Sequence, residues 1–171
     1  MKPEYKIAFD AERCMSCYGC VTACKVWRER PHGINCRRIE RLWINDGGRM
    51  PRLRFASVNC QHCADPACVS ICVMNALTKN EDGIVMFDES KCVGCRECLR
   101  VCQFSVPQYL DSRKMVKCDL CAGRFDMEKE EPPCVATCPT RALKLVRMTP
   151  EEKAKDEAAL LKLLASDTLK K

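Results

Sequence analysis

The cysteine spacing between residues 92 and 102 constrains this chain more than any other feature. Cys92, Cys95 and Cys98 recur at every third residue, and Cys102 follows after three more. Three thiols this close on a short loop suit three corner irons of an iron–sulfur cube, while the fourth thiol, on a following helix, suits a neighbouring cluster. A zinc site would use four thiols in total, usually as two separated CxxC pairs. The run therefore favours an iron–sulfur cluster over zinc.

Cysteines make up 17 of the 171 residues. Such a content is typical either of a secreted disulfide scaffold or of a metal protein in a reducing compartment. A disulfide scaffold does not explain thiols at every third residue or an odd cysteine count. Sixteen cysteines form four groups of four, which predicts four [4Fe–4S] clusters. The groups are Cys14, Cys17, Cys20 and Cys24; Cys60, Cys63, Cys68 and Cys72; Cys92, Cys95, Cys98 and Cys102; and Cys118, Cys121, Cys134 and Cys138.

The chain contains an internal duplication. Phe9-Asp10 aligns with Phe87-Asp88 at an offset of 78 residues, and the first cysteine group then falls on the third. The second and fourth groups both end in Cys-x-x-x-Ala-Leu. We therefore predict two ferredoxin-like halves, residues 1–77 and 78–148, with residues 36–58 inserted in the first half and a helical tail at 149–171.

The local patterns predict an α+β fold of duplicated, bacterial ferredoxin-like modules, in which short β-hairpins and short helices surround four clusters. Predicted strands cover residues 7–9, 77–78, 84–87 and 143–146; a hairpin pairs 38–44 with 53–58 through an Asn-Asp-Gly-Gly turn at 45–48; short helices cover 20–28 and 98–101. The clusters replace much of the hydrophobic core, so we expect little folded structure without metal.

The tail is predicted to be an amphipathic helix. Thr149 and Glu152 form a capping-box pattern, with Pro150 at the first helical position. The apolar residues that share one face are Ala154, Ala158, Leu161, Leu164 and Ala165. An isolated helix of this length is marginal in water. Its apolar face therefore either folds back on the chain's own body or docks on another chain, including a second copy bound through residues 149–165.

The charge of the chain excludes one class of function and indicates another. Its formal charge is +6, but four oxidised clusters with thiolate ligands would bring about −8, giving about −2 in the loaded protein. The basic residues then serve mainly to balance cluster charge. No basic run is interleaved with several aromatic residues, so we predict no nucleic-acid binding.

Other signals are missing from the sequence. No apolar run approaches the ~20 residues of a membrane span. Residues 1–7 contain neither an apolar signal core nor a twin-arginine pair, which predicts a cytoplasmic protein or one exported with a signal-bearing partner. The chain has no glycine-rich phosphate loop and no residue set suited to an organic substrate. We therefore predict that it is not itself an enzyme.

Residues 5–147 resemble the four-cluster ferredoxin-type electron-transfer subunits of molybdenum and tungsten oxidoreductases. The resemblance lies in the four groups in order, in Gln-His-Cys-Ala-Asp-Pro-Ala-Cys at 61–68, in Val-Pro-Gln-Tyr at 106–109 and in Cys138-Pro139. Members serve dimethyl sulfoxide, polysulfide and nitrite reductases, formate dehydrogenases, hydrogen-dependent carbon dioxide reductases and tungsten aldehyde oxidoreductases.

The resemblance implies an electron relay between a large catalytic molybdopterin or tungstopterin subunit and a second redox partner, which is a flavin subunit, a hydrogenase or a ferredoxin. Two alternatives remain open. One is a scaffold that polymerises through its C-terminal helix into an electron-conducting filament. The other is a free soluble polyferredoxin.

The resemblance also implies an exchange of ligands between cysteine groups. The implied sets are Cys14, Cys17, Cys20 and Cys138; Cys118, Cys121, Cys134 and Cys24; Cys60, Cys63, Cys68 and Cys102; and Cys92, Cys95, Cys98 and Cys72. Pairing of groups within each half would use the same sixteen thiols in other sets. The chain departs from the family at Val73 and Gln103, where a proline often follows the last cysteine.

A few further residues are candidates for supporting roles. We predict that Cys36, the seventeenth thiol, is unligated and structural. His62, between two predicted ligands, either donates a hydrogen bond near a cluster or faces solvent. A group of basic residues lies in the inserted segment and just before it. These residues either compensate cluster charge or dock an acidic partner. They are Arg28, Arg30, Arg37, Arg38 and Arg41.

Overall fold

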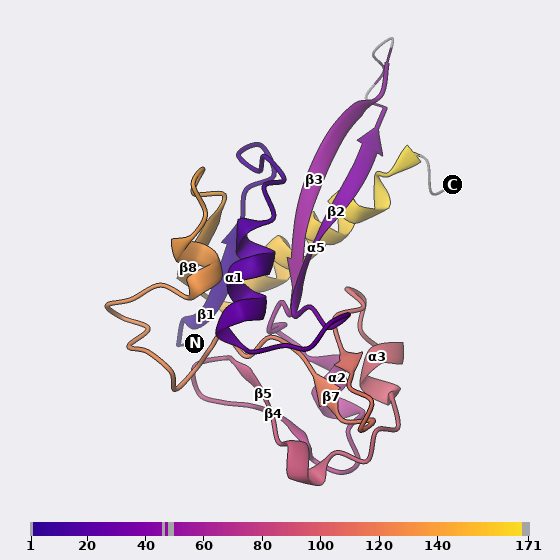
Figure 1. The fold of residues 1–171 in the computed structure, drawn as a ribbon, viewed down its shortest axis with the longest axis vertical. Helices are drawn as coiled ribbons and strands as arrows, with labels where there is room; N and C mark the ends of the chain where they lie inside the picture. The colour runs from indigo at the N-terminus through magenta and orange to yellow at the C-terminus, as the bar shows by residue number, and fades with distance from the viewer. Residues whose placement is uncertain (1, 46, 48–49, 169–171) are drawn as a thin grey trace.

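The computed structural model describes residues 2–45, 47 and 50–168. Within them the strands form four separate two-stranded antiparallel sheets (Figure 1). The strands are β1 (Glu4–Phe9), β2 (Arg37–Ile44), β3 (Arg52–Asn59), β4 (Leu77–Lys79), β5 (Val85–Phe87), β6 (Gln108–Tyr109), β7 (Met115–Val116) and β8 (Leu143–Met148). The helices are α1 (Gly19–Trp27), α2 (Ala67–Ser70), α3 (Glu97–Arg100), α4 (Pro133–Ala136) and α5 (Pro150–Ala165), with a 3-10 turn η1 (Glu89–Lys91). The mixed class of short strands and helices predicted from the sequence is confirmed.

One sheet joins the two halves of the sequence, and another lies at the boundary between them. β1 pairs with β8, so that Phe9 lies opposite Leu143. β4 pairs with β5, so that Leu77 lies opposite Phe87. Helices α1 and α4 pack together beside β8, while α2 packs on α3 and β4. The chain therefore brings its first and fourth cysteine groups together in one region, and its second and third groups together in another (Figure 1).

The β2–β3 hairpin extends away from the rest of the molecule (Figure 1). Its register places Arg37 opposite Asn59 at the base and Ile44 opposite Arg52 near the tip. Residues 46 and 48 of the predicted connecting turn lie outside the described residues. The predicted strand positions are confirmed to within about a residue at each end. Arg37, at the base of the hairpin, is buried in the interior.

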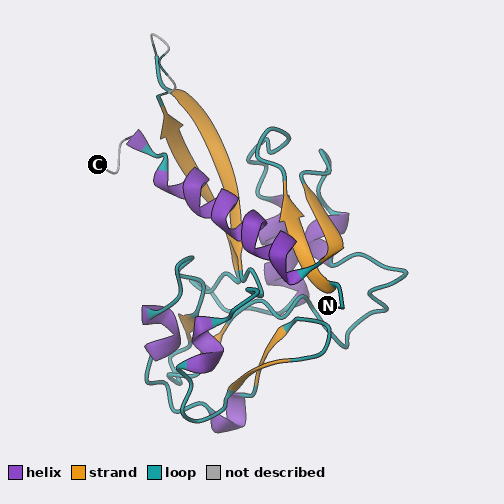
Figure 2. Ribbon diagram, turned by 180° about the vertical axis from the view of Figure 1, so that it is seen from behind, coloured by secondary structure: helices purple, strands orange, loops and turns teal. Residues whose placement is uncertain are grey.

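Helix α5 begins at the predicted capping box, in which Thr149 and Glu152 bond reciprocally. It packs against β1, β3 and β8 and lies in front of the hairpin in Figure 2. Its buried Leu160 packs in an apolar cluster with Leu42 and Val58 of the hairpin and with Phe104 and Val106. The apolar side of the helix therefore packs on the chain's own body. No helix in the described part of the chain has both the length and the apolar character needed to cross a bilayer.

The predicted face of α5 is wrong at its three alanines. Ala154 and Ala158 in the first half and Ala165 at the end are exposed, whereas Lys153 is buried. The first half of the helix docks through ion pairs instead of apolar contacts. Lys153 Nζ lies 2.7 Å from Glu4 Oε2, and Asp156 Oδ2 lies 2.7 Å from Lys6 Nζ. Two β1 side chains of opposite charge thus bind two α5 side chains of opposite charge.

The hairpin β6–β7 was not predicted. It pairs Gln108 with Val116 and Tyr109 with Met115 around a short turn. Each strand has only two residues, which is too short to show the alternation that identifies a strand in a sequence. The polar run Asp-Ser-Arg-Lys at 111–114 was the available turn signal.

Candidate metal centres

The sixteen grouped cysteines come together in four sets, each with three thiols from one group and one thiol from another. We number these sets as sites. They are site I (Cys14, Cys17, Cys20, Cys138), site II (Cys118, Cys121, Cys134, Cys24), site III (Cys60, Cys63, Cys68, Cys102) and site IV (Cys92, Cys95, Cys98, Cys72).

Sites I and IV each surround one pocket with all four of their thiols. The loop at each site contains two residues with left-handed backbone angles, Ser16 and Tyr18 at site I and Gly94 and Arg96 at site IV. Ser16 and Gly94 are 78 positions apart, and so are Tyr18 and Arg96, as in the sequence repeat. Left-handed residues in a tight loop direct successive N–H groups to one concave side, which suits an anion. Both loops are therefore shaped to surround a negatively charged group.

Site II is the most enclosed of the four. Cys24, Cys121 and Cys134 are buried. Burial, together with the neighbouring thiols, raises the pKa of Cys118 to about 12 and, with Asp119 next in effect, that of Cys121 to about 11. These thiols are neutral near pH 7 unless a metal displaces their protons.

Site III lies beneath helix α5. Cys63, Cys68 and Cys102 line its pocket together with Glu157 of α5. Cys60 completes the set, because its thiol interacts electrostatically with those of Cys63 and Cys68. Burial raises the pKa of Cys68 to about 11. The helix therefore helps to enclose the site.

His62 is fully buried between Cys60 and Cys63, so the solvent-facing alternative is wrong. Its Nδ1 accepts a hydrogen bond of 2.9 Å from the N–H of Val85. Burial, followed by the charge of Lys117 and other lysines, holds the pKa of His62 well below its usual value. The ring is therefore neutral with its proton on Nε2. Within the described residues Nε2 has no hydrogen-bond partner, which leaves one buried donor beside site III.

Backbone and side-chain donors already surround several of the thiols. The N–H of Leu120 lies 3.4 Å from Cys118 Sγ. At Cys138, burial opposes the thiolate, but backbone hydrogen bonds, led by that of Leu143, outweigh it and lower the pKa. At site IV the Tyr109 hydroxyl lies 3.1 Å from Cys98 Sγ. Such donors stabilise thiolate and tune a bound cluster.

Sites I, III and IV each border a pocket that is lined by three or four of their own thiols. Across the described residues, no three His, Cys, Asp or Glu side chains gather closely enough to hold a single ion. The thiols instead stand around a volume, with inward N–H groups, which fits a cluster with several irons.

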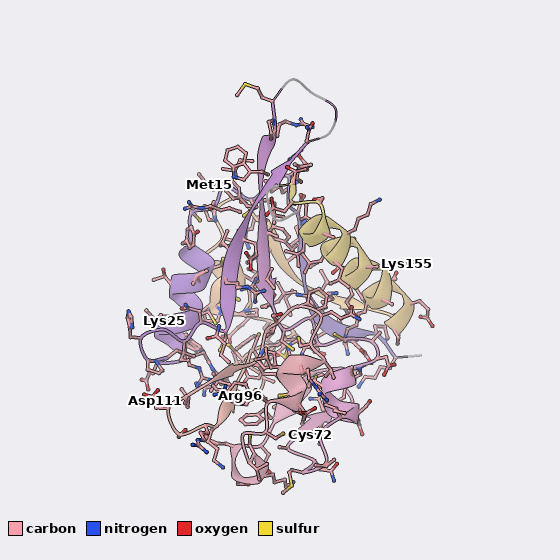
Figure 3. The ribbon with its side chains drawn as sticks, turned by 90° about the vertical axis from the view of Figure 1, so that its right-hand side faces the viewer. Met15, Lys25, Cys72, Arg96, Asp111 and Lys155 are labelled. Atoms are coloured by element: carbon pink, nitrogen blue, oxygen red, sulfur yellow. The ribbon has the colours of Figure 1, made fainter. Side chains whose placement is uncertain are left out.

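The four sites follow one another in a line. The thiol of Cys20 at site I interacts with Cys134 at site II. Cys118 at site II interacts with Cys60 at site III. Cys68 at site III interacts with Cys98 at site IV. In Figure 3, Met15 beside site I and Cys72 of site IV lie in opposite halves of the molecule. The order is therefore I–II–III–IV.

Cys36, the seventeenth thiol, lies close to a ligand candidate of site II. It is buried and shares a hydrogen bond with Cys24 of site II. That bond, with the nearby Arg30 charge, lowers the pKa of Cys36 despite its burial. Its unligated, structural role stays a prediction.

Sequence reasoning missed two supporting residues. Tyr109 appeared only as the last residue of the Val-Pro-Gln-Tyr element, yet its hydroxyl contacts Cys98, and Arg96 stacks on its ring at 5.2 Å from the centroid. Arg37 appeared only as one of a basic stretch, yet it is almost completely buried. The strand RRIERLWI has no apolar alternation on the face of Arg37 that could have indicated this burial.

Comparisons with known proteins agree with this chemistry. Residues 51–148 match the family described as a 4Fe-4S dicluster domain. The chain is 39% identical over 151 residues to one subunit of the anaerobic dimethyl sulfoxide reductase of Escherichia coli, covering 84% of this chain and 73% of that protein.

Two further relatives serve other reactions. The thiosulfate reductase electron transfer subunit PhsB of Salmonella typhi is 36% identical over 152 residues, covering 87% of this chain and 79% of that protein. The formate dehydrogenase iron-sulfur subunit of Wolinella succinogenes is 34% identical over 167 residues, covering 84% and 82%. The similarity is thus shared by subunits whose names refer to three different reactions.

Proposed function

This chain belongs to the family of iron–sulfur electron-transfer subunits of molybdenum oxidoreductases, and we propose that it relays electrons through four [4Fe–4S] clusters. The relay connects a large catalytic molybdopterin or tungstopterin subunit with a second redox partner, which is a flavin subunit, a hydrogenase or a ferredoxin. The observation that carries this proposal is the linear order of sites I–IV, with an exposed thiol at each end, Cys17 and Cys95.

We assign the ligands as the four sites defined above. Cys138 lines the same pocket as Cys14, Cys17 and Cys20, which supports exchange between groups over pairing within each half. The repeated left-handed positions support the duplicated ferredoxin-like modules. We keep the sequence division at residues 1–77, 78–148 and 149–171, although the β1–β8 sheet joins the first two segments and β4 spans their boundary.

The chain's own residues bind the clusters, orient them and exclude water. Bound clusters supply one-electron chemistry without proton transfer to a substrate. The thiolates hold the irons, the loop N–H groups stabilise the thiolates, and the buried cations balance their charge. We expect no substrate turnover by the chain alone, in keeping with the names of its relatives as electron transfer and iron-sulfur subunits.

Apolar side chains surround both ends of the relay and support docking there. At site IV they include Val73, which is 87% exposed, and Val93. At site I, Met15 is exposed next to a ligand. Docked partners would cover these side chains and shorten the path to the terminal clusters. The free cysteines also suit a reducing compartment, in keeping with a cytoplasmic location.

The two alternatives receive less support. A filament assembled through residues 149–165 requires a free helix face, but Leu160 and its neighbours pack on the chain's own body. A free polyferredoxin would leave the apolar ends of the relay uncovered. We therefore favour the relay subunit over both alternatives.

Anaerobic purification through this chain, with metal analysis of the whole complex, tests the proposal. We expect about sixteen irons per chain, with molybdenum or tungsten in a co-purifying large subunit. Zinc, or iron for only two clusters, would overturn the four-cluster assignment. Iron without any partner would favour the free polyferredoxin.

Paired ligand variants test the assignment itself. Cys17→Ser and Cys138→Ser should abolish the same electron paramagnetic resonance signal, because both thiols belong to site I. Cys24→Ser should affect a different one. If Cys138→Ser and Cys17→Ser removed different signals, the exchange of ligands would be wrong.

A further inference from the structure

Arg37 is a buried cation in an unusual place. It is the first residue of β2 and is 2% exposed. Arginine is almost never buried so deeply unless an anion compensates its charge. Its Nη1 donates a hydrogen bond of 2.8 Å to Ser57 Oγ on β3. A serine hydroxyl is neutral, so this bond positions the guanidinium without compensating its charge.

The remaining donors of Arg37 have no protein partner. Nε and Nη2 are buried and unbonded within the described residues. Four thiols act electrostatically on the guanidinium, and each of them becomes a thiolate when it binds metal. Those thiols are Cys134, Cys118, Cys20 and Cys24. One belongs to site I and three belong to site II, so the anions that Arg37 requires lie at both sites.

Two residues of β3 connect Arg37 with both sites. Ser57 Oγ, which accepts from Arg37, also lies 3.8 Å from Cys20 Sγ of site I. Asn59 stands opposite Arg37 in the register, and its Nδ2 lies 3.8 Å from Cys118 Sγ of site II. Ser57 and Asn59 are alternate residues of a strand and share one face. Arg37 and these two side chains therefore form a polar strip between sites I and II.

We propose that Arg37 is the shared counter-ion of sites I and II and raises the reduction potential of both. This inference rests on the proposed four-cluster relay. Reduction at either site adds one electron and breaks no bond, so the negative charge at that site grows by one. A fixed positive charge in a poorly solvated interior favours the reduced form. Arginine suits this task because it stays protonated throughout.

The shared position has a second consequence. A single charge between two adjacent sites favours one electron at either site about equally, so it raises both potentials together and leaves the difference between them unchanged. Lys117, buried between backbone carbonyls of Val85 and Cys118, lies outside this strip.

Arg37→Met, measured against Arg41→Met, tests the proposal in the anaerobically prepared holoprotein. Both variants remove one positive charge from β2, but Arg41 is exposed. Potentiometric titration followed by electron paramagnetic resonance should show the equilibrium constant for reduction falling at least tenfold at sites I and II in Arg37→Met, which is about 59 mV for one electron. Sites III and IV should stay within experimental error, and Arg41→Met should shift none. Ligand variants of each site identify the signals.

Each remaining outcome decides the question. Unchanged potentials in a fully loaded Arg37→Met protein would overturn the proposal while leaving about sixteen irons, and so the relay, intact. If Arg37→Met loses iron at sites I and II but Arg37→Lys retains it, the sites require the positive charge, which supports the proposal. If Arg37→Lys also loses iron while Arg41→Met loads normally, Arg37 acts through shape, and the proposal fails. A parent protein without four clusters would instead refute the proposed function.

Discussion

Sites II and IV each contain four thiols, but the surroundings of the two sites are opposite. Site II lies inside the molecule, where Cys24, Cys121 and Cys134 are buried. Site IV lies at one end, where Cys95 is exposed and apolar side chains such as Val73 face solvent. An enclosed site must have its negative charge balanced by a fixed cation, because water is excluded. An exposed site is balanced by water and salt, and can pass electrons to a docked partner.

The two sites also differ in what they contribute to the fold. Cys24 and Cys134 belong to the largest apolar cluster, with Leu120 and Leu143. The thiols of site IV only border a small cluster of Leu77, Val85 and Met115. The metal at site II therefore takes the place of core side chains, whereas the metal at site IV stabilises a peripheral loop. The contrast between sites II and IV gives the largest expected effect and the smallest one, and the docking of helix α5 gives two intermediate ones.

The largest effect is expected from removing one ligand at each site. Cys134→Ser should destabilise the folded protein by more than about 4 kcal/mol, because it removes metal and leaves a polar group in the core. Cys95→Ser should lose the iron of one cluster and retain the remainder. Iron content and thermal unfolding by circular dichroism measure both. Equal losses in the two variants would show that burial does not separate the sites.

The second prediction concerns the cover of site III. Leu160 of α5 belongs to a cluster of buried apolar side chains, and Cys60, Cys63 and Cys102 of site III pack against this cluster. Leu160→Ala should cost about 2–5 kcal/mol and should make the iron of site III the first to be released to a chelator. Ala158→Ser, on the exposed side of the same helix, is the matched control. Release from all sites at one rate would mean that α5 does not protect site III in particular.

Local patterns in the sequence predict the ligands and the repeated elements well. Cysteine spacing, the 78-residue repeat and the strands of the hairpin depend on such patterns, and these appear in the structure near their predicted positions. The buried role of Arg37 depends on a contact with Ser57, twenty residues away, and on thiols of two other segments. The sequence shows that a residue is charged but not how deeply its side chain is buried, so a buried arginine and an exposed one look alike.

The same limit explains the error at helix α5. Helical periodicity identifies an apolar face, and it placed Ala154 and Ala158 inward. The structure instead buries Lys153, because Glu4 from the opposite end of the sequence compensates its charge. Alanine contributes too little apolar area to outweigh two ion pairs formed in a partly enclosed place. A pairing between residues 149 positions apart in the chain leaves no local signal.

The third prediction uses pH to loosen this docking. Burial would raise the pKa of Glu4, but hydrogen bonds from Lys153 and Lys79 outweigh it and lower that pKa below its usual value of 4.5. Its contribution is therefore present above about pH 4.5 and is lost as the pH falls through the lower folded value. Hydrogen exchange in α5 should be faster in Glu4→Gln than in the parent at pH 6, and the difference should close under acid. A pH-independent difference would assign the effect to packing.

The smallest effect is expected at the exposed end. The Tyr109 hydroxyl lies 3.1 Å from Cys98 Sγ, and one such hydrogen bond contributes about 1 kcal/mol. Tyr109→Phe should therefore lower the equilibrium constant for reduction at site IV about fivefold and leave site II unchanged. Tyr18→Phe, beside site I, controls for the general loss of a hydroxyl. Because water already balances charge at site IV, this shift should be smaller than that of Arg37→Met at site II; an equal or larger shift would mean that a single hydrogen bond, and not burial, sets the difference between the two sites.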